Sequence, residues 1–66
     1  MVPEYQQRVI DERSALERKA KDLSKFIGYS PIFEELYPID QELLREQNDI
    51  MWSYYEILSK RIQRFN

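Results

Sequence analysis

The sequence predicts an all-α protein: an antiparallel two-helix hairpin with a short capping connector, assembling into an oligomer. Two long stretches, residues 4–27 and 40–65, contain neither glycine nor proline, and most of their residues are good helix formers. Between them, residues 28–39 hold the single glycine and two of the three prolines, which is typical of a connector. Because 66 residues are close to the lower limit for an independent core, we expect residues 1–66 to form one domain.

The first helix is predicted to run from about residue 3 to residue 26 or 27. Charged pairs four residues apart, Glu4–Arg8 and Glu17–Lys21 among them, support it. Gly28 stands where a helix often ends in a left-handed residue. The apolar positions follow alternating three- and four-residue steps, which predicts one narrow stripe. The stripe consists of Val2, Tyr5, Val9, Leu16, Leu23 and Phe26, with the charged residues Glu12 and Lys19 in two of its places.

The connector contains a second, shorter helical signal. Ser30 followed by Pro31 predicts an N-cap and a first-turn proline, opening a helical turn that reaches about Leu36. The segment is too apolar for a simple exposed linker, so we expect it to fold back over the closed end of the hairpin. Its apolar residues are Tyr29, Ile32, Phe33, Leu36, Tyr37 and Ile39.

The second helix is predicted to begin near residues 38–40, with Asp40 as candidate N-cap, and to continue to about residue 65. Its main stripe contains Leu44, Gln47, Met51, Tyr54, Leu58, Arg61 and Phe65. Leu43, Ile50 and Ile57 form a flank beside this stripe, so the apolar face is wider than one helix can cover. The flank predicts a subunit interface, the remaining way to add buried surface in a small chain without cysteine or histidine.

Closing the hairpin at the connector sets an approximate register. Leu23 is expected near Leu44 and Tyr5 across from Ile62. Glu12 then faces Tyr54 and Tyr55, and Lys19 faces Gln47 and Asn48. Two interpretations of these polar layers stay open: they fix the register of the helices, or they line a ligand cavity shared between subunits.

Composition excludes several function classes. Without histidine or cysteine the chain lacks the usual general base and the strongest nucleophile, so we expect no enzyme. No acidic residues have the spacing of a calcium-binding loop, so we expect no metal. We also expect no cofactor. A net charge of −2 argues against binding a nucleic acid polymer. No apolar run spans a membrane and no signal peptide opens the chain, which favours the cytoplasm.

Two groups of polar residues are candidate binding residues. Lys21, Ser24 and Lys25, on the last turns of the first helix, offer charge and a hydroxyl to a phosphate, although a solvated basic end explains them as well. Arg8, Arg61 and Arg64 are expected to gather at the open end of the hairpin, where arginine suits bidentate phosphate recognition, surface ion pairing being the alternative. Aromatic residues that could stack a base, or simply fill the core, are Tyr5, Trp52, Tyr54 and Tyr55.

Four segments extend these patterns over nearly the whole chain: YQQRVIDE (residues 5–12), DLSKFIG (22–28), SPIFEEL (30–36) and ELLREQNDIMWSYYEILSKRI (42–62). They resemble the small phage-encoded helical hairpins that include the anti-CBASS cyclic-nucleotide sponge, and an anti-Thoeris sponge carries a similar hairpin. The resemblance implies a homohexamer built from dimers that sequesters cyclic di- or trinucleotides in the cytoplasm of the infected bacterial host, without cleaving them.

The resemblance also implies binding residues. The family's lysine and hydroxyl near the end of the first helix match Asp22 and Ser24, so an acid that repels phosphate stands in place of the lysine. An early tyrosine matches Tyr5, and an arginine of the last helix matches Arg61 or, next, Arg64. We therefore predict an immune-evasion sponge; the alternative is a structural or protein-interaction hairpin without a small-molecule ligand. The predicted ligand-binding residues are Tyr5, Arg8, Lys21, Ser24, Lys25, Arg61 and Arg64.

Overall fold

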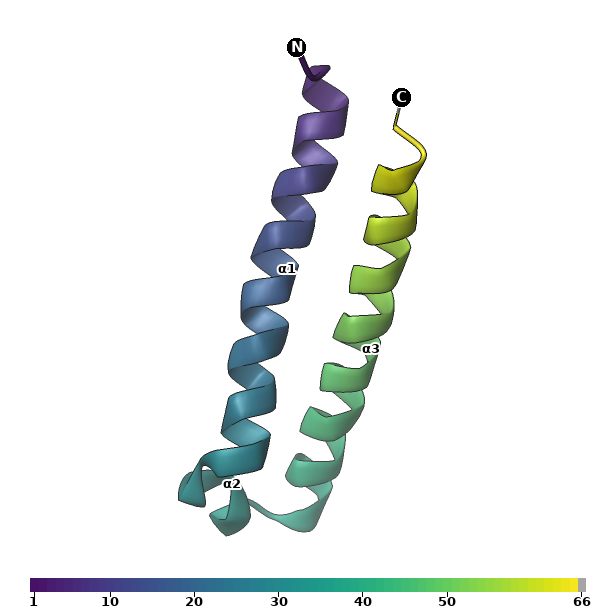
Figure 1. Ribbon diagram of the computed structural model, residues 1–66. Helices are drawn as coiled ribbons and strands as arrows, with labels where there is room; N and C mark the ends of the chain where they lie inside the picture. Colours follow the sequence, from purple (N-terminus) through teal and green to yellow (C-terminus); the bar gives the residue numbers. More distant parts are fainter. Residues whose placement is uncertain (66) are drawn as a thin grey trace.

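The computed structural model describes residues 1–65 and contains three helices: α1 (Glu4–Tyr29), α2 (Pro31–Glu35) and α3 (Pro38–Gln63). The two long helices lie side by side and antiparallel, α2 closes one end, and both chain termini lie at the other end (Figure 1). The molecule is a rod of 48 × 15 × 14 Å. The predicted all-α hairpin with a short connector is confirmed, while its assembly into an oligomer stays a prediction.

The ends of α1 differ from their prediction at the glycine. The Pro3 carbonyl accepts the N–H groups of Gln6 and Gln7, both at 3.0 Å, and so starts the helix. At the other end the helix runs through Gly28, which has no positive φ, and the Ser30 N–H closes the last turn on the Phe26 carbonyl at 3.1 Å. The prediction that Gly28 is a left-handed cap is therefore wrong, because the stop comes from the extended Ser30 before Pro31.

The start of α2 is as predicted, and α3 begins at Pro38, within the predicted range, but its N-cap is not the predicted Asp40. The Ser30 Oγ accepts the Ile32 N–H at 3.2 Å, and Pro31 occupies the first turn of α2. In α3 the N-cap position belongs to Tyr37, with Pro38 at the first helical position. Asp40 lies inside the first turn, where its carboxylate complements the helix dipole instead of capping.

The connector covers the closed end mainly through one side chain. Phe33 is 2% exposed and meets the Phe26 ring edge to face, with ring centroids 5.9 Å apart. The Arg45 guanidinium lies 5.1 Å from the centre of the Phe33 ring. Gln41 Nε2 donates to the carbonyls of Phe33 at 2.9 Å and Leu36 at 3.2 Å, which ties α3 to the end of α2. The expected cover is only partly correct, because other connector residues are exposed: Tyr29, Ile32, Tyr37 and Ile39.

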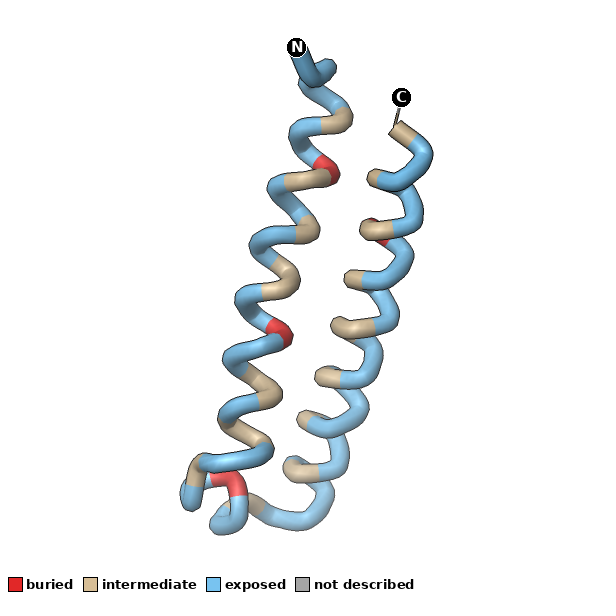
Figure 2. Tube along the Cα trace, in the orientation of Figure 1, coloured by how far each residue is buried: buried red, intermediate tan, exposed pale blue. Residues whose placement is uncertain are grey.

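The seam between the long helices contains few fully buried residues. Val9, Ala20 and Leu58 are buried there, with Phe33 at the closed end (Figure 2). On α1 the predicted column of Val9, Leu16 and Leu23 does face the seam, but it alternates with Gln6, Arg13, Ala20 and Ile27. Glu12 and Lys19 are exposed, so their placement in the seam was wrong. From a core residue such as Val9, a helix places both the residue three positions on (Glu12) and the residue four positions on (Arg13) close to the same face. The structure uses the second set, because the small side chain of Ala20 lets α3 approach where the longer Lys19 would not.

The same shift occurs on α3. Its predicted column of Leu44, Met51, Leu58 and Phe65 faces α1. The alternating positions are Gln41, Asn48, Tyr55 and Ile62, each one residue beyond the predicted face. Gln47, Tyr54 and Arg61 are exposed instead, which corrects that part of the predicted stripe. In both helices the main apolar column was predicted correctly. The second column that completes each seam lies on the opposite side of the main column from the one predicted.

Contacts across the seam give the actual register. Tyr5 meets Phe65, with ring centroids 6.3 Å apart, whereas Ile62 was its expected partner. The Tyr55 hydroxyl donates to Glu17 at 3.4 Å, where Glu12 was the expected partner. Arg13 donates from Nη1 to the Ser59 Oγ at 3.3 Å. These polar contacts cross the seam and can set the register, as one of the two interpretations held, but on α1 they use Arg13 and Glu17 in place of Glu12 and Lys19.

The outer flank of α3 is uncovered in the hairpin, as predicted. Leu43 is 55% exposed, Ile50 61% and Ile57 52%. Among residues 1–65, no helix is long and apolar enough to cross a lipid bilayer. The uncovered flank is consistent with the predicted subunit interface, which the single hairpin does not test.

Candidate functional site

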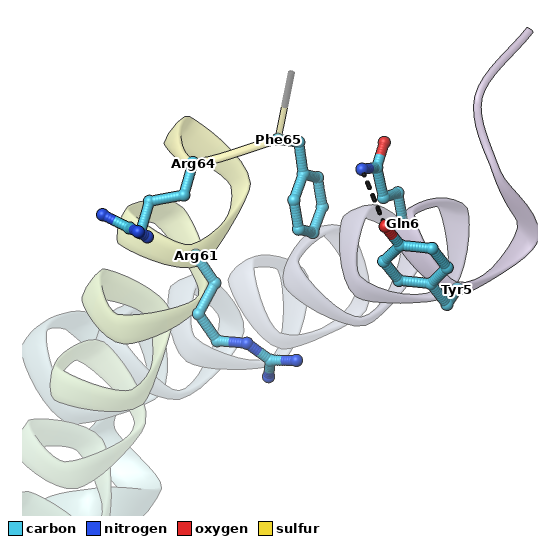
Figure 3. A pocket seen from close by; sticks show the side chains of 5 residues that line it. All are labelled: Tyr5, Gln6, Arg61, Arg64 and Phe65. Carbon is cyan, nitrogen blue, oxygen red and sulfur yellow. Dashed lines mark hydrogen bonds between the residues drawn. The ribbon is translucent and has the colours of Figure 1, made fainter.

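The open end of the hairpin carries a hollow of about 420 Å³. Helix α1 contributes Tyr5 and Gln6 to its lining, α3 contributes Arg61, and the turn after α3 contributes Arg64 and Phe65 (Figure 3). The start of α1 and the end of α3 meet here because the hairpin closes at the other end. This position therefore combines two guanidinium groups with two aromatic rings.

Contacts within the lining fix the aromatic part of the hollow. The Tyr5 and Phe65 rings pack edge to face at an interplanar angle of 77°. Gln6 Nε2 donates to the Tyr5 hydroxyl at 3.3 Å, which limits rotation of the tyrosine (Figure 3). Tyr5 nevertheless keeps 64% of its surface in solvent. An aromatic surface held in place and still accessible can stack a planar ligand.

Both arginines line the hollow, but the Arg64 side chain points away from the Tyr5 and Phe65 rings, and the Arg61 side chain takes a different direction (Figure 3). Both are exposed, and neither forms an ion pair with a carboxylate of residues 1–65, where the pairs are Arg8–Glu4 and Lys21–Glu17. The N-terminus of α1 and the C-terminus of α3 lie at this end, so their opposite dipole charges partly cancel. The guanidinium groups add two positive charges to this end, and the fork of N–H donors that each carries matches a phosphate.

Arg8, predicted at the same end, is not part of the lining. Its Nη2 donates to the Glu4 Oε1 at 2.7 Å in an exposed i, i+4 pair. Such a pair contributes a few tenths of a kcal/mol to helix stability. Of the predicted group of Arg8, Arg61 and Arg64, the structure places Arg61 and Arg64 in one lining together with Tyr5, and it leaves Arg8 on the outer surface of α1.

The predicted cluster at the other end of α1 is not formed. Lys21 pairs with Glu17 at 3.5 Å and lines a shallow hollow of about 300 Å³ with Ser14, Glu17 and Arg18. Lys25 is exposed and absent from that lining. Because Ser24 turns into the seam, the two lysines have no hydroxyl between them.

Ser24 belongs to a polar layer that joins the helices. Its hydroxyl donates to the Asn48 Oδ1 at 3.1 Å and accepts the Trp52 Nε1–H at 3.1 Å. Asn48 Nδ2 also donates to the Ala20 carbonyl at 3.1 Å. Within the hairpin the hydroxyl is engaged by Asn48 and Trp52, so it contributes to the register of the helices, and its expected ligand role stays a prediction. Trp52 serves the same layer, and its ring meets Tyr55 edge to face at 5.4 Å.

Sequence reasoning missed two lining residues, Gln6 and Phe65. Phe65 was placed in the apolar stripe, which it does join, but its position after the end of α3 also exposes it to the hollow. Gln6 follows Tyr5 directly, yet nothing in its type distinguishes it from Gln7. Among residues 1–65, no three acidic, histidine or cysteine side chains are grouped as a metal site.

Comparison with known proteins places this hairpin in a family. A family model described as Sequestin matches residues 3–64. The chain is also similar to an uncharacterized 7.5 kDa protein of the denB–rIIB intergenic region of Enterobacteria phage T4. The two are 44% identical over 61 residues, covering 92% of this chain and 94% of the T4 protein. No solved structure gives a significant match.

These matches correct the resemblance to the anti-CBASS and anti-Thoeris sponge hairpins. The model that covers the chain is that of Sequestin, so membership of the sponge hairpins is wrong, and the residue matches carried over from them lose their basis. The resemblance rested on alternating charged and apolar helical segments, and any amphipathic hairpin repeats such patterns. The chain is a phage protein with the fold of a small helical hairpin, and it belongs to the Sequestin family.

Proposed function

We propose that this protein binds and sequesters a phosphate-bearing nucleotide without cleaving it, and that cyclic oligonucleotide second messengers are its ligands. It would act by stoichiometric trapping in the cytoplasm of the infected host, as an immune-evasion protein and not as an enzyme. The observation that carries the proposal is the hollow at the open end, where Arg61 and Arg64 stand beside the Tyr5–Phe65 pair. The family name, Sequestin, agrees with sequestration.

Each part of the hollow has a role in the proposal. The guanidinium groups of Arg61 and Arg64 hold phosphate oxygens by paired, charge-assisted hydrogen bonds. The exposed face of Tyr5, steadied by Gln6 and Phe65, stacks a base. The lining offers no histidine or cysteine and no carboxylate to act on a bound phosphodiester, which favours retention of the ligand over turnover.

Titration calorimetry with a panel of cyclic di- and trinucleotides tests the proposal directly. We expect saturable heat with at least one member, and weaker binding at higher salt because the contacts are ionic. Replacing either arginine, as Arg61→Ala or Arg64→Ala, removes a charge-assisted contact of about 1.5–3 kcal/mol and should weaken binding roughly 10- to 150-fold. Lys19→Ala removes an exposed cation outside the hollow and should leave the affinity unchanged.

A second candidate is a protein-interaction hairpin with no small-molecule ligand. The specific observation in its favour is the row of exposed apolar residues on α3. If no member of the nucleotide panel gives heat at high protein concentration, this candidate replaces the first. If Arg61→Ala and Lys19→Ala weaken binding equally, the nucleotide binds through general charge and the hollow is not its site.

A further inference from the structure

We propose that a second copy of this chain covers the outer face of α3, with the two α3 helices antiparallel and a two-fold axis at Ile50. The face, here called the outer stripe, consists of Ile39, Leu43, Ile50, Tyr54 and Ile57. These side chains are between 43% and 61% exposed. Successive members lie four, seven, four and three residues apart, so they share one side of α3, away from the buried and half-buried positions that face α1.

The exposed area of this elongated rod is large enough to accommodate a partner of the same size. The chain exposes 5447 Å², whereas a compact monomer of its 8.1 kDa mass exposes about 4,500 Å². The excess of roughly 900 Å² is close to the ~800 Å² that each partner buries in a standard interface. Among residues 1–65, four are buried in the single hairpin, which makes additional burial valuable for stability.

The spacing of the outer stripe fits an antiparallel copy. Leu43 and Ile57 each lie seven residues from Ile50. With Ile50 against the partner's Ile50, Leu43 therefore lies against the partner's Ile57, and the reverse pair forms by symmetry. The apolar side chains then meet in three successive layers, two turns of helix apart.

Charge selects the antiparallel orientation over the parallel one. The first half of α3 is acidic, with Asp40, Glu42, Glu46 and Asp49, while Lys60 and Arg61 occupy its last turn. The antiparallel arrangement brings Glu42 alongside the partner's Lys60 and sets the helix dipoles in opposite directions. A parallel arrangement would place the acidic halves together, at a cost in repulsion.

Helix α1 does not offer an equivalent surface, which makes α3 the element that pairs. Among the described residues of α1, the large apolar side chains with high exposure are Tyr5 and Tyr29, which lie at opposite ends of the helix and form no continuous row. The rest of its outer surface is charged or polar, as at Glu12, Arg18, Lys19 and Asp22. The assembly therefore follows from the outer stripe, and it does not depend on the nucleotide proposed above.

The mass of the full chain in solution, measured without nucleotide by sedimentation equilibrium, tests the proposal first. We expect a mass near twice 8.1 kDa, or a larger even multiple. Ile50→Glu places two carboxylates on the axis and should reduce the mass to that of one chain. The matched control is Ile32→Glu, an isoleucine 58% exposed on α2, which should leave the mass unchanged. A single-chain mass for the unsubstituted protein would overturn the proposal.

Cysteine cross-linking tests the axis even if Ile50→Glu fails to fold, because the chain contains no cysteine. Ile50→Cys should oxidise readily to a disulfide-linked pair. Leu43→Cys should not link to itself, since two such residues would lie about 21 Å apart along an antiparallel pair, far beyond disulfide reach. Mixing Leu43→Cys with Ile57→Cys should restore the link. Efficient self-linking of Leu43→Cys would show a parallel pair and refute the proposed axis.

Discussion

Helices α1 and α3 are equally long, with 26 residues each, but they present very different outer surfaces. Each gives one face to the other across the seam. Beyond that face α1 is charged, whereas α3 carries the outer stripe from Ile39 to Ile57. The comparison shows that a hairpin needs one apolar face per helix, and that any additional apolar width is surface that a second molecule can cover.

The largest expected loss of stability comes from a substitution on the inner face of α3, and it distinguishes that face from the outer stripe. Leu58 is fully buried, so Leu58→Ala should lower the free energy of unfolding by about 2–5 kcal/mol. In a hairpin with so few buried residues this loss should remove most of the helical circular dichroism at 25 °C. Ile57→Ala, one residue away on the outer stripe, should leave the helicity of the hairpin intact and weaken only its association. Equal unfolding by both substitutions would mean that α3 has no distinct outer face.

The inner and outer faces of α1 can be compared by substituting its two alanines, one on each face. Ala20 has no exposed surface and faces α3, so Ala20→Leu should overpack the seam and cost about 1–3 kcal/mol. Ala15 is exposed, and Ala15→Leu should change the unfolding free energy by less than about 0.5 kcal/mol. Urea denaturation followed by circular dichroism measures both. If Ala20→Leu is tolerated as well as Ala15→Leu, the close approach of the helices at Ala20 is wrong.

The polar layer at Ser24 should produce a smaller loss. Ser24→Ala leaves the Trp52 indole N–H and the Asn48 side chain without one partner each, at a cost of about 1–2 kcal/mol. Trp52 is the only tryptophan, so its fluorescence should also shift as its hydrogen bond is lost. Ser14→Ala, on the exposed side of α1, is the control and should change neither quantity. An unshifted spectrum in Ser24→Ala would argue against the Trp52 contact.

The smallest effect has the opposite sign. Gly28 is helical, and a Cβ added there meets no atom within 4 Å, so Gly28→Ala should stabilise the hairpin by about 0.5–1 kcal/mol. Alanine at a left-handed cap would instead destabilise it. A measured decrease in the midpoint of urea unfolding would restore the cap that the sequence suggested.

The candidate site was predictable only in part. Tyr5, Arg61 and Arg64 could be grouped from the sequence because a hairpin must bring its two chain ends together. Ser24 could not be separated from Lys21 and Lys25, since its hydroxyl faces a tryptophan 28 residues away. Phe65 enters the site through the local geometry after α3, and Gln6 enters it through its place in the first turns of α1, neither of which residue type encodes.

The sequence by itself determined the two long helices, the connector with its Ser30–Pro31 start, and the columns of Val9, Leu16 and Leu23 and of Leu44, Met51 and Leu58. Only the tertiary structure decided which neighbouring column completes each seam. A helix repeats every 3.6 residues, so the column of positions three before and four after each core residue lies almost as close to its face as the column four before and three after. The choice falls to the partner helix, which approaches over Ala20 and turns Glu12 and Lys19 to solvent.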